Sequence, residues 1–257
     1  MSEFSDDELD RYARHIVLRE IGGRGQALLR AANVAVIGAG GLGSPCLLYL
    51  AAAGVGRLTV IDDDTVAISN LQRQIVFTTA DAGRPKVAAA ADRLAALNPH
   101  VAVTPVAARI DAENARHLLT GHDLVADGCD SFATRLVVAD TAQALGLPLV
   151  SGAVGSFDGQ VATFKGYLSD LPCYRCLVGA ASDRAGASCA DVGVIGALTG
   201  VIGAMMALEV IREVTGFGDS LVGRLLLYDA MGARMRTVRL PKDPGCQGCG
   251  GTMPADL

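Results

Sequence analysis

The sequence has no tryptophan, and aromatic residues make up only 4% of its 257 positions. Charged residues are also sparse, at 19%, and the formal net charge is −5 at pH 7. A protein that binds mainly nucleic acid needs a basic face to neutralise phosphates, and the sequence has no such face. The start of the chain, MSEFSDDELDRYARHI, is acidic and amphipathic, so it lacks the basic and then apolar order of a secretory signal. We therefore expect a cytoplasmic protein that does not have nucleic acid as its main partner.

Hydrophobic residues and glycine are abundant, with 51% hydrophobic residues and 31 glycines. This length and composition suit one large α/β domain or two small ones with a substantial buried core. The run 192–211 is apolar except for Glu209, which is long enough to suggest a membrane span. Its four glycines favour instead a buried helix packed closely on another surface, with a dimer interface as the natural candidate. We expect no membrane span.

The order of predicted elements is that of a doubly wound α/β fold. Ser5 and Glu8 match a capping box, so we expect a helix over 5–20, ended by Gly22 and Gly23. A βαβ unit and further alternating elements follow, at strand 33–37, helix 45–53, strand 57–61, helix 86–97 and strands 101–106, 124–127 and 148–151. Segments 160–164 and 224–228 resemble antiparallel strands. The expected fold is therefore a Rossmann-like, mostly parallel sheet with an antiparallel C-terminal extension.

The glycine loop GAGGLG follows the first predicted strand and precedes a helix. Gly38, Gly40 and Gly43 match the spacing G-x-G-x-x-G, and Asp62 ends the next strand. Glycines let the backbone approach a phosphate at the positive end of a helix, and a carboxylate at Asp62 can accept both ribose hydroxyls. A tight turn without a ligand is the alternative. The fingerprint alone would indicate NAD.

Three cationic residues, Arg14, Arg73 and Lys86, favour a triphosphate over a dinucleotide, although each could simply be solvated. Lys86 lies at a predicted helix N-terminus, where the helix dipole disfavours a cation unless an anion is near. Asp130 follows the strand 124–127 at the edge where α/β sheets bind ligands, and it could hold magnesium or cap the helix 131–145.

The cysteines give a second signal. Cys173, Cys176, Cys246 and Cys249 form two C-x-x-C pairs, which supply the four thiolates of a closed zinc site. A zinc clasp would tie the C-terminal region back to the chain, and a redox dithiol is the alternative. Cys46 and Cys129 are expected in the core or lining the site. Cys189 is expected in a loop, as either a reactive thiol or an ordinary free one.

Three motifs together, GAGGLGS at 38–44, DDDTVAISNLQRQ at 62–74 and RPK at 84–86, resemble the MoeB/ThiF family, the prokaryotic counterparts of ubiquitin-activating enzymes. The resemblance extends from about residue 5 to 250 and includes CYRC at 173–176 and PGCQGC at 244–249. It implies ATP-dependent adenylation of the C-terminal glycine of a ubiquitin-like sulphur carrier ending in Gly-Gly. The length, without a downstream rhodanese domain, favours the MoaD-like subunit of molybdopterin synthase as that carrier.

The resemblance also implies roles for particular residues. Arg73, Lys86 and Asn70 would contact phosphates, Asp130 would hold magnesium, and Arg14 would reach the γ-phosphate across a homodimer interface. In some members a cysteine at the position of Cys189 takes part in covalent sulphur transfer. The implied nucleotide-binding set comprises Gly38, Gly40, Gly41, Gly43, Asp62, Ser69, Asn70, Leu71, Gln72, Arg73, Lys86, Cys129 and Asp130.

The expected organisation is a single adenylation domain over 1–257, with a helical arm at 1–30, a nucleotide-binding part at 31–155 and a carrier-binding part at 156–257. Three alternatives stay open. The same chemistry could act on the ThiS-like carrier of the thiamine pathway. The loop and Asp62 alone would suit an NAD-dependent oxidoreductase. The chain could also be a non-catalytic module that only docks a ubiquitin-like partner.

Overall fold

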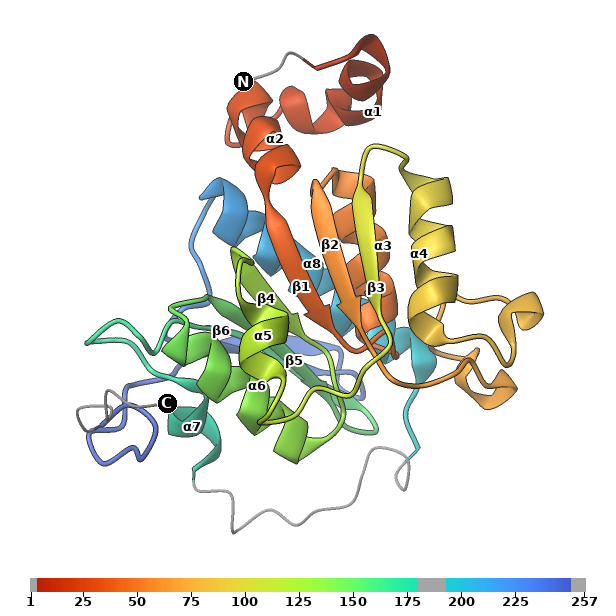
Figure 1. Ribbon diagram of the computed structural model, residues 1–257. Helices are drawn as coiled ribbons and strands as arrows, with labels where there is room; N and C mark the ends of the chain where they lie inside the picture. Colours follow the sequence, from red (N-terminus) through yellow and green to blue (C-terminus); the bar gives the residue numbers. More distant parts are fainter. Residues whose placement is uncertain (1–3, 180–192, 251–257) are drawn as a thin grey trace.

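A single eight-stranded sheet forms the centre of the computed structural model, which describes residues 4–179 and 193–250 (Figure 1). The strand order is β3-β2-β1-β4-β5-β6-β7-β8. The first five strands in this order are parallel, and the last three are antiparallel to their neighbours. The strands are β1 (Asn33–Ile37), β2 (Arg57–Ile61), β3 (Ala102–Val106), β4 (Leu124–Asp127), β5 (Leu149–Val154), β6 (Asp158–Phe164), β7 (Arg224–Asp229) and β8 (Arg234–Arg239). The expected doubly wound sheet with an antiparallel C-terminal extension is confirmed.

Helices cover both faces of the parallel part. One buried cluster joins the sheet to α3, α4 and α8, and the other joins it to α5, α6 and α7. The helices are α1 (Asp6–Ile16), α2 (Gly22–Ala31), α3 (Gly43–Ala53), α4 (Lys86–Leu97), α5 (Ala115–Leu119), α6 (Phe132–Ala144), α7 (Tyr174–Val178) and α8 (Gly196–Thr215). The crossing over 63–81, where no periodic element was expected, contains only two short 3-10 turns, η1 (Ile68–Asn70) and η2 (Thr79–Asp81).

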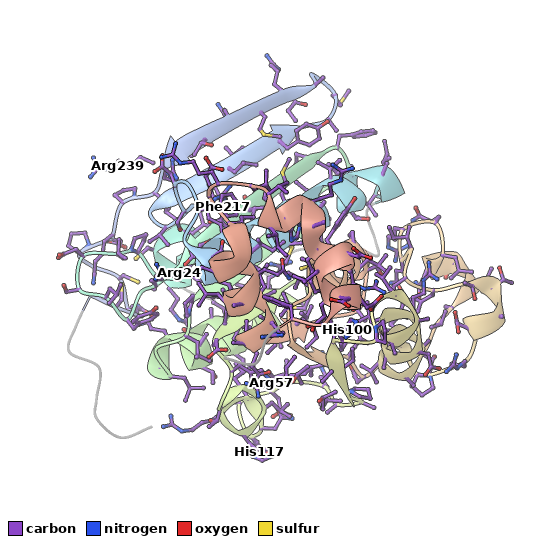
Figure 2. All side chains as sticks on the ribbon, turned by 90° about the horizontal axis from the view of Figure 1, so that it is seen from above. Arg24, Arg57, His100, His117, Phe217 and Arg239 are labelled. Carbon is purple, nitrogen blue, oxygen red and sulfur yellow. The ribbon has the colours of Figure 1, made fainter. Side chains whose placement is uncertain are left out.

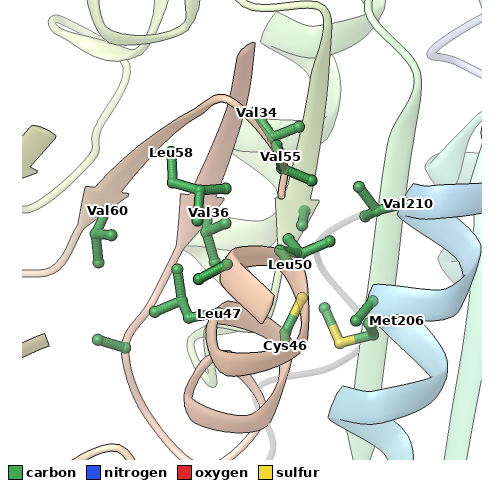
Figure 3. Packing of buried hydrophobic residues seen from close by; sticks show 14 of the residues in the cluster. Val34, Val36, Cys46, Leu47, Leu50, Val55, Leu58, Val60, Met206 and Val210 are labelled. Carbon is green, nitrogen blue, oxygen red and sulfur yellow. The ribbon is translucent and has the colours of Figure 1, made fainter. Parts of the chain in front are cut away.

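Helix α8 packs against α3 and the sheet, and this packing requires the glycine at position 203. Figure 3 shows Met206 and Val210 of α8 beside Cys46 and Leu50 of α3. A Cβ at Gly203 would lie 2.4 Å from the carbonyl oxygen of Leu42, so only glycine allows this approach. Among the helices in the described part of the chain, none has the length and apolar character needed to cross a bilayer.

Glu209, the charged residue inside this apolar run, connects α8 to β6 and to the segment before β7. Its carboxylate accepts from the Thr163 hydroxyl at 3.0 Å and from the backbone N–H of Leu221 at 2.6 Å, and it pairs with Arg212. The carboxylate is buried, but these donors satisfy its hydrogen-bonding capacity. The helix runs from Gly196 to Thr215, which is a shift from the expected 192–211.

The N-terminal arm crosses the end of the sheet where the parallel strands begin. Figure 2 looks onto this end, with α1 and α2 in front and Arg57, the first residue of β2, facing the viewer. The capping box of Ser5 and Glu8 is confirmed, but α1 ends at Ile16 and not at residue 20. The second helix, α2, was missed because Gly22 and Gly23 were read as terminators, whereas α2 begins at Gly22. Strand β8 was also missed, since all six of its residues are exposed and leave no apolar face to detect.

Candidate active site

A cavity of about 460 Å³ opens at the carboxyl ends of the parallel strands, at the opposite end of the sheet from α1. This volume lies in the range of about 300–1,000 Å³ that is usual for small-molecule sites. Its lining extends from the turn after β3 across the ends of β2, β1 and β4 to the antiparallel part. The lining includes eight of the expected site residues, Gly38, Gly40, Gly41, Asp62, Arg73, Lys86, Cys129 and Asp130.

The glycine loop lies in the centre of the cavity wall, between β1 and α3. Gly38 has a φ of 86°, which favours glycine, and its N–H donates to the carbonyl of Ile61 at 2.9 Å. A Cβ at Gly43 would lie 1.8 Å from the carbonyl oxygen of Gly38, so no larger residue fits there. At Gly40 the nearest atom to an added Cβ is the side-chain nitrogen of Gln74 at 3.8 Å. Gly43 is therefore required by the fold, whereas nothing in the folded chain itself requires glycine at position 40.

Asp62 ties the end of β2 to the glycine loop. One carboxylate oxygen accepts from the N–H of Ala39 at 2.8 Å and the other from the N–H of Asp64 at 2.9 Å. Burial raises the pKa of Asp62, while the charge of Lys86 and the two backbone donors act to lower it. Each oxygen keeps a free lone pair, so the carboxylate can also accept hydroxyl groups from a ligand.

Two of the cations that line the cavity are Arg73, in the crossing segment, and Lys86, just after it. Lys86 is buried at the start of α4, and its Nζ donates to a carboxylate oxygen of Asp64 at 2.7 Å. Asp64 is thus an anion that explains a lysine at a helix N-terminus. Arg73 donates to the carbonyl of Ser69 at 3.3 Å. Since the Asp64 side chain is 67% exposed, a phosphate can replace it as the partner of Lys86 at little cost.

The loop after β4 carries Asp130 into the cavity with its side chain exposed. The hydroxyl of Ser131 caps α6 by accepting from the N–H of Thr134 at 3.4 Å. The alternative in which Asp130 is the helix cap is therefore wrong, and its carboxylate is available to a ligand. Burial, followed by the charge of Asp127, raises the pKa of the Cys129 thiol well above its usual range. That thiol is consequently protonated at neutral pH and is a poor nucleophile.

A buried polar network under this loop was missed by sequence reasoning. Arg135 of α6 lies among Asp127, Ser151 and Tyr174, and all four residues are buried. Sequence reasoning assigned Asp127 only to a strand, although a carboxylate ending a buried strand signals a partner cation. Arg109, after β3, also lines the cavity and was not singled out.

Several expected residues do not line the cavity in this single chain. Gly43 is enclosed behind the loop, and Arg14 lies on α1 at the other end of the sheet. The segment at 69–72 lies in and just after the turn η1, beside the cavity, and Leu71 packs on the core instead. The residues absent from the lining are Gly43, Ser69, Asn70, Leu71, Gln72 and Arg14.

The four expected metal ligands come together in a cluster beside α7. The sulphur of Cys173 lies 3.9 Å from that of Cys176 and 3.6 Å from that of Cys246, and Cys176 lies 3.4 Å from Cys249. Four sulphurs bound to zinc at about 2.3 Å in a tetrahedron would lie about 3.8 Å apart. A disulfide would need about 2.05 Å. The cluster fits a closed zinc site and not an oxidised dithiol. Cys189 lies outside the described residues.

Comparisons with known proteins agree with this arrangement. The model of the ThiF family matches residues 12–248. A sulfur carrier protein adenylyltransferase of Thermus thermophilus is 47% identical over 96% of this chain and 93% of its own length. A molybdopterin-synthase adenylyltransferase of Salmonella typhimurium is 43% identical over 97% of this chain and all of its own length. A crystal structure of E. coli MccB with MccA-N7isoASN superposes with a TM-score of 0.84 over 96% of this chain and 76% of that one, and its 20% identity shows the fold alone.

The chain belongs to the ThiF family. Within the family it is an adenylyltransferase, the name carried by three of the relatives that share nearly its whole length.

Proposed function

We propose that the chain transfers AMP from ATP to the C-terminal glycine carboxylate of a small ubiquitin-like sulphur carrier. One observation carries the proposal. The same cavity is lined by the glycine loop with Arg73, Lys86 and Asp130 and, further along, by Ala153 and Val154 at the end of β5 and by Gln160 of the antiparallel strand β6. A nucleotide on the first set and an extended peptide end on the second would meet inside one cavity.

The chemistry needs no general base. A C-terminal carboxylate has a pKa of about 3.5 and is already ionised at pH 7. One of its oxygens attacks the α-phosphorus of ATP, the bond to the bridging oxygen breaks, and pyrophosphate leaves with the electron pair. Catalysis then consists of holding the two anions in line and stabilising the charge that moves to pyrophosphate. Arg73 and Lys86 supply positive charge for this purpose, and the N-terminus of α3 adds backbone N–H groups.

Asp130 would hold magnesium, whose charge would help to neutralise the phosphates. Asp62 would accept the ribose hydroxyls, and Asn70 would contact a phosphate after a small movement of its turn. Arg14 would act on the cavity of a second copy, because α1 lies at the end of the sheet remote from its own cavity. The active enzyme is in this proposal a homodimer with sites completed across the interface.

The four thiolates, Cys173, Cys176, Cys246 and Cys249, would hold zinc as a structural clasp, and the chemistry of adenylation does not pass through it. We keep the division into a helical arm at 1–30, a nucleotide-binding part at 31–155 and a carrier-binding part at 156–257 as part of the proposal. One sheet spans the second and third parts, so they would move as one body.

The carrier is proposed to be MoaD-like, because relatives named for molybdopterin synthase match this chain over nearly all of its length. A ThiS-like carrier is the second candidate, since another relative is named only for a sulphur carrier protein.

Exchange of labelled pyrophosphate into ATP, measured with each purified carrier in parallel, tests the proposal. We expect exchange that depends on the carrier and that is lost in Arg73→Ala and Asp130→Ala. A ThiS-like carrier that supports faster exchange than the MoaD-like one would reassign the pathway. No exchange with any Gly-Gly-ended carrier would refute the proposed activity.

A further inference from the structure

The guanidinium of Arg135 connects the loop that carries Asp130 to the cysteine cluster. The Arg135 residue is only 7% exposed, and its guanidinium has partners on several sides. One nitrogen lies 3.5 Å from a carboxylate oxygen of Asp127 and donates to the hydroxyl of Ser151 at 3.2 Å. Burial acts to lower the pKa of Arg135, but the charge of Asp127 together with the contributions of Cys129 and Tyr174 outweighs this, and the pKa is raised. The side chain is a fixed cation whose partners are all set by the fold.

On the cavity side, Arg135 and Asp127 hold both backbone groups of Cys129. A second nitrogen of Arg135 donates to the carbonyl of Cys129, and the other carboxylate oxygen of Asp127 accepts from its N–H at 3.1 Å. With its N–H and carbonyl both bound, the peptide before Asp130 has one orientation. The direction of the Asp130 carboxylate into the cavity therefore depends on Arg135.

On the other side, the hydroxyl of Tyr174, the residue that directly follows the cluster ligand Cys173, is close enough to the Arg135 guanidinium to interact with its charge. Tyr174 is buried, and its ring packs edge-on against Phe164 with the centroids 5.4 Å apart. A Cβ at Gly166 would lie 2.3 Å from the Cβ of Cys173, so the backbone is also closely packed around that ligand. Closure of the cluster thus fixes the position of the tyrosine hydroxyl.

We propose that Arg135 and Tyr174 are positioning residues through which the metal-closed cysteine cluster orients the Asp130 loop for nucleotide binding. The metal and ATP then bind with positive coupling, although the cluster does not line the cavity. This inference rests on the proposed function only in taking Asp130 as part of the nucleotide site.

The cluster also contacts α6 by a route that avoids the loop, and this route supplies a control. Arg175 forms two hydrogen bonds with Asp140, at 2.8 and 2.6 Å, in the middle of α6. Changing Asp140 loosens the attachment of the cluster to α6 without touching Arg135 or Cys129. If only the attachment of the cluster to the rest of the fold mattered, Asp140→Asn and Tyr174→Phe would change the affinity for ATP to the same extent.

The test compares the full-length wild type, Tyr174→Phe and Asp140→Asn, each with its metal and after removal of the metal by a chelator. Two quantities are measured, the dissociation constant of ATP in the presence of magnesium and the hydrogen exchange of the backbone amides at 128–131. Removal of the metal from the wild type should weaken ATP binding about 10-fold, the usual effect of losing one hydrogen bond to a charged group. Amide exchange in the loop should rise with it.

With its metal still bound, Tyr174→Phe should already show the weaker ATP binding and the faster amide exchange in the loop. Chelation should then weaken its ATP binding by less than about a further 2-fold. Asp140→Asn should bind ATP like the wild type and respond to chelation as the wild type does. If Tyr174→Phe lost its metal, Arg135→Lys, which leaves every residue of the cluster intact, would take its place. The inference is overturned if metal-bound Tyr174→Phe, or Arg135→Lys in its place, binds ATP as tightly as the wild type. It is also overturned if chelation weakens ATP binding by the same factor in that variant and in the wild type. Loop exchange is read without any carrier, so a failure of the proposed activity would leave this test decisive.

Discussion

Replacing Gly40 by alanine separates the needs of the fold from those of the ligand. A methyl group at position 40 would meet no atom of the chain closer than 3.8 Å. The φ of Gly40 is not positive, so alanine is not strained there. Because alanine has less freedom than glycine in the unfolded chain, Gly40→Ala should leave the free energy of unfolding unchanged or raise it by about 0.4–1 kcal/mol.

Nucleotide binding should respond in the opposite direction. Gly40 lines the cavity, and the methyl group would occupy space that we assign to a phosphate. Overpacking of this kind costs about 1–3 kcal/mol, which corresponds to about a 5- to 150-fold weaker affinity. Calorimetric titration with ATP and a thermal unfolding scan of the same preparation measure the two effects separately.

Gly43→Ala is the matched control. Its methyl group would lie 1.8 Å from the Gly38 carbonyl oxygen, so we expect a loss of about 3 kcal/mol of stability along with the loss of binding. The assignment of phosphates to the loop is refuted if Gly40→Ala binds ATP as tightly as the wild type.

Three further predictions follow from the geometry. Lys86→Met should lower the rate of pyrophosphate exchange about 10²- to 10³-fold. The free energy of unfolding of this variant, measured in urea, should change by less than about 1 kcal/mol, because Asp64, the partner of Lys86, is 67% exposed and can be solvated. Glu8→Gln should cost about 1 kcal/mol at pH 7, and this cost should decline as pH falls below 4.5. The backbone N–H of Ser5 lowers the pKa of Glu8, so its stabilising effect is complete above the unfolded value of 4.5 and is lost as pH falls through the lower folded pKa; a cost that did not decline with falling pH would contradict this. Elemental analysis should find one zinc per chain and none in Cys246→Ser, and an equal zinc content in both would disprove the cluster as the site.

The sequence predicted those parts of the molecule that short-range patterns determine. The strand, glycine loop and helix from Asn33 to Ala53 form a local unit, in which the positive φ of Gly38 and the close approach of Gly43 to the Gly38 carbonyl require glycine. The helix α4 has the predicted limits of 86 and 97 because an apolar periodicity begins directly after Pro85. The cysteine spacing predicted the cluster because two C-x-x-C pairs leave few other arrangements.

The missed parts depend on contacts that are remote in sequence. Nothing near Arg135 indicates that it lies beside Ser151 and Tyr174, since those residues come from other elements. The exposed strand β8 exists because β7 pairs with it, and its own residues carry no apolar alternation. The role of Arg14 across a dimer interface was given only by resemblance, and its distance from the cavity in one chain follows from the position of α1 across the opposite end of the sheet.

The central claim is that a carboxylate at the end of a carrier protein attacks the α-phosphorus of ATP in this cavity. Intact-mass spectrometry of a purified Gly-Gly-ended carrier, taken after a single turnover with enzyme, ATP and magnesium, tests it directly. The account predicts a carrier that has gained one AMP, with equimolar pyrophosphate, and no such product with Asp130→Ala enzyme or with a carrier lacking its last glycine. An unmodified carrier, or AMP attached anywhere other than the terminal carboxylate, would contradict it.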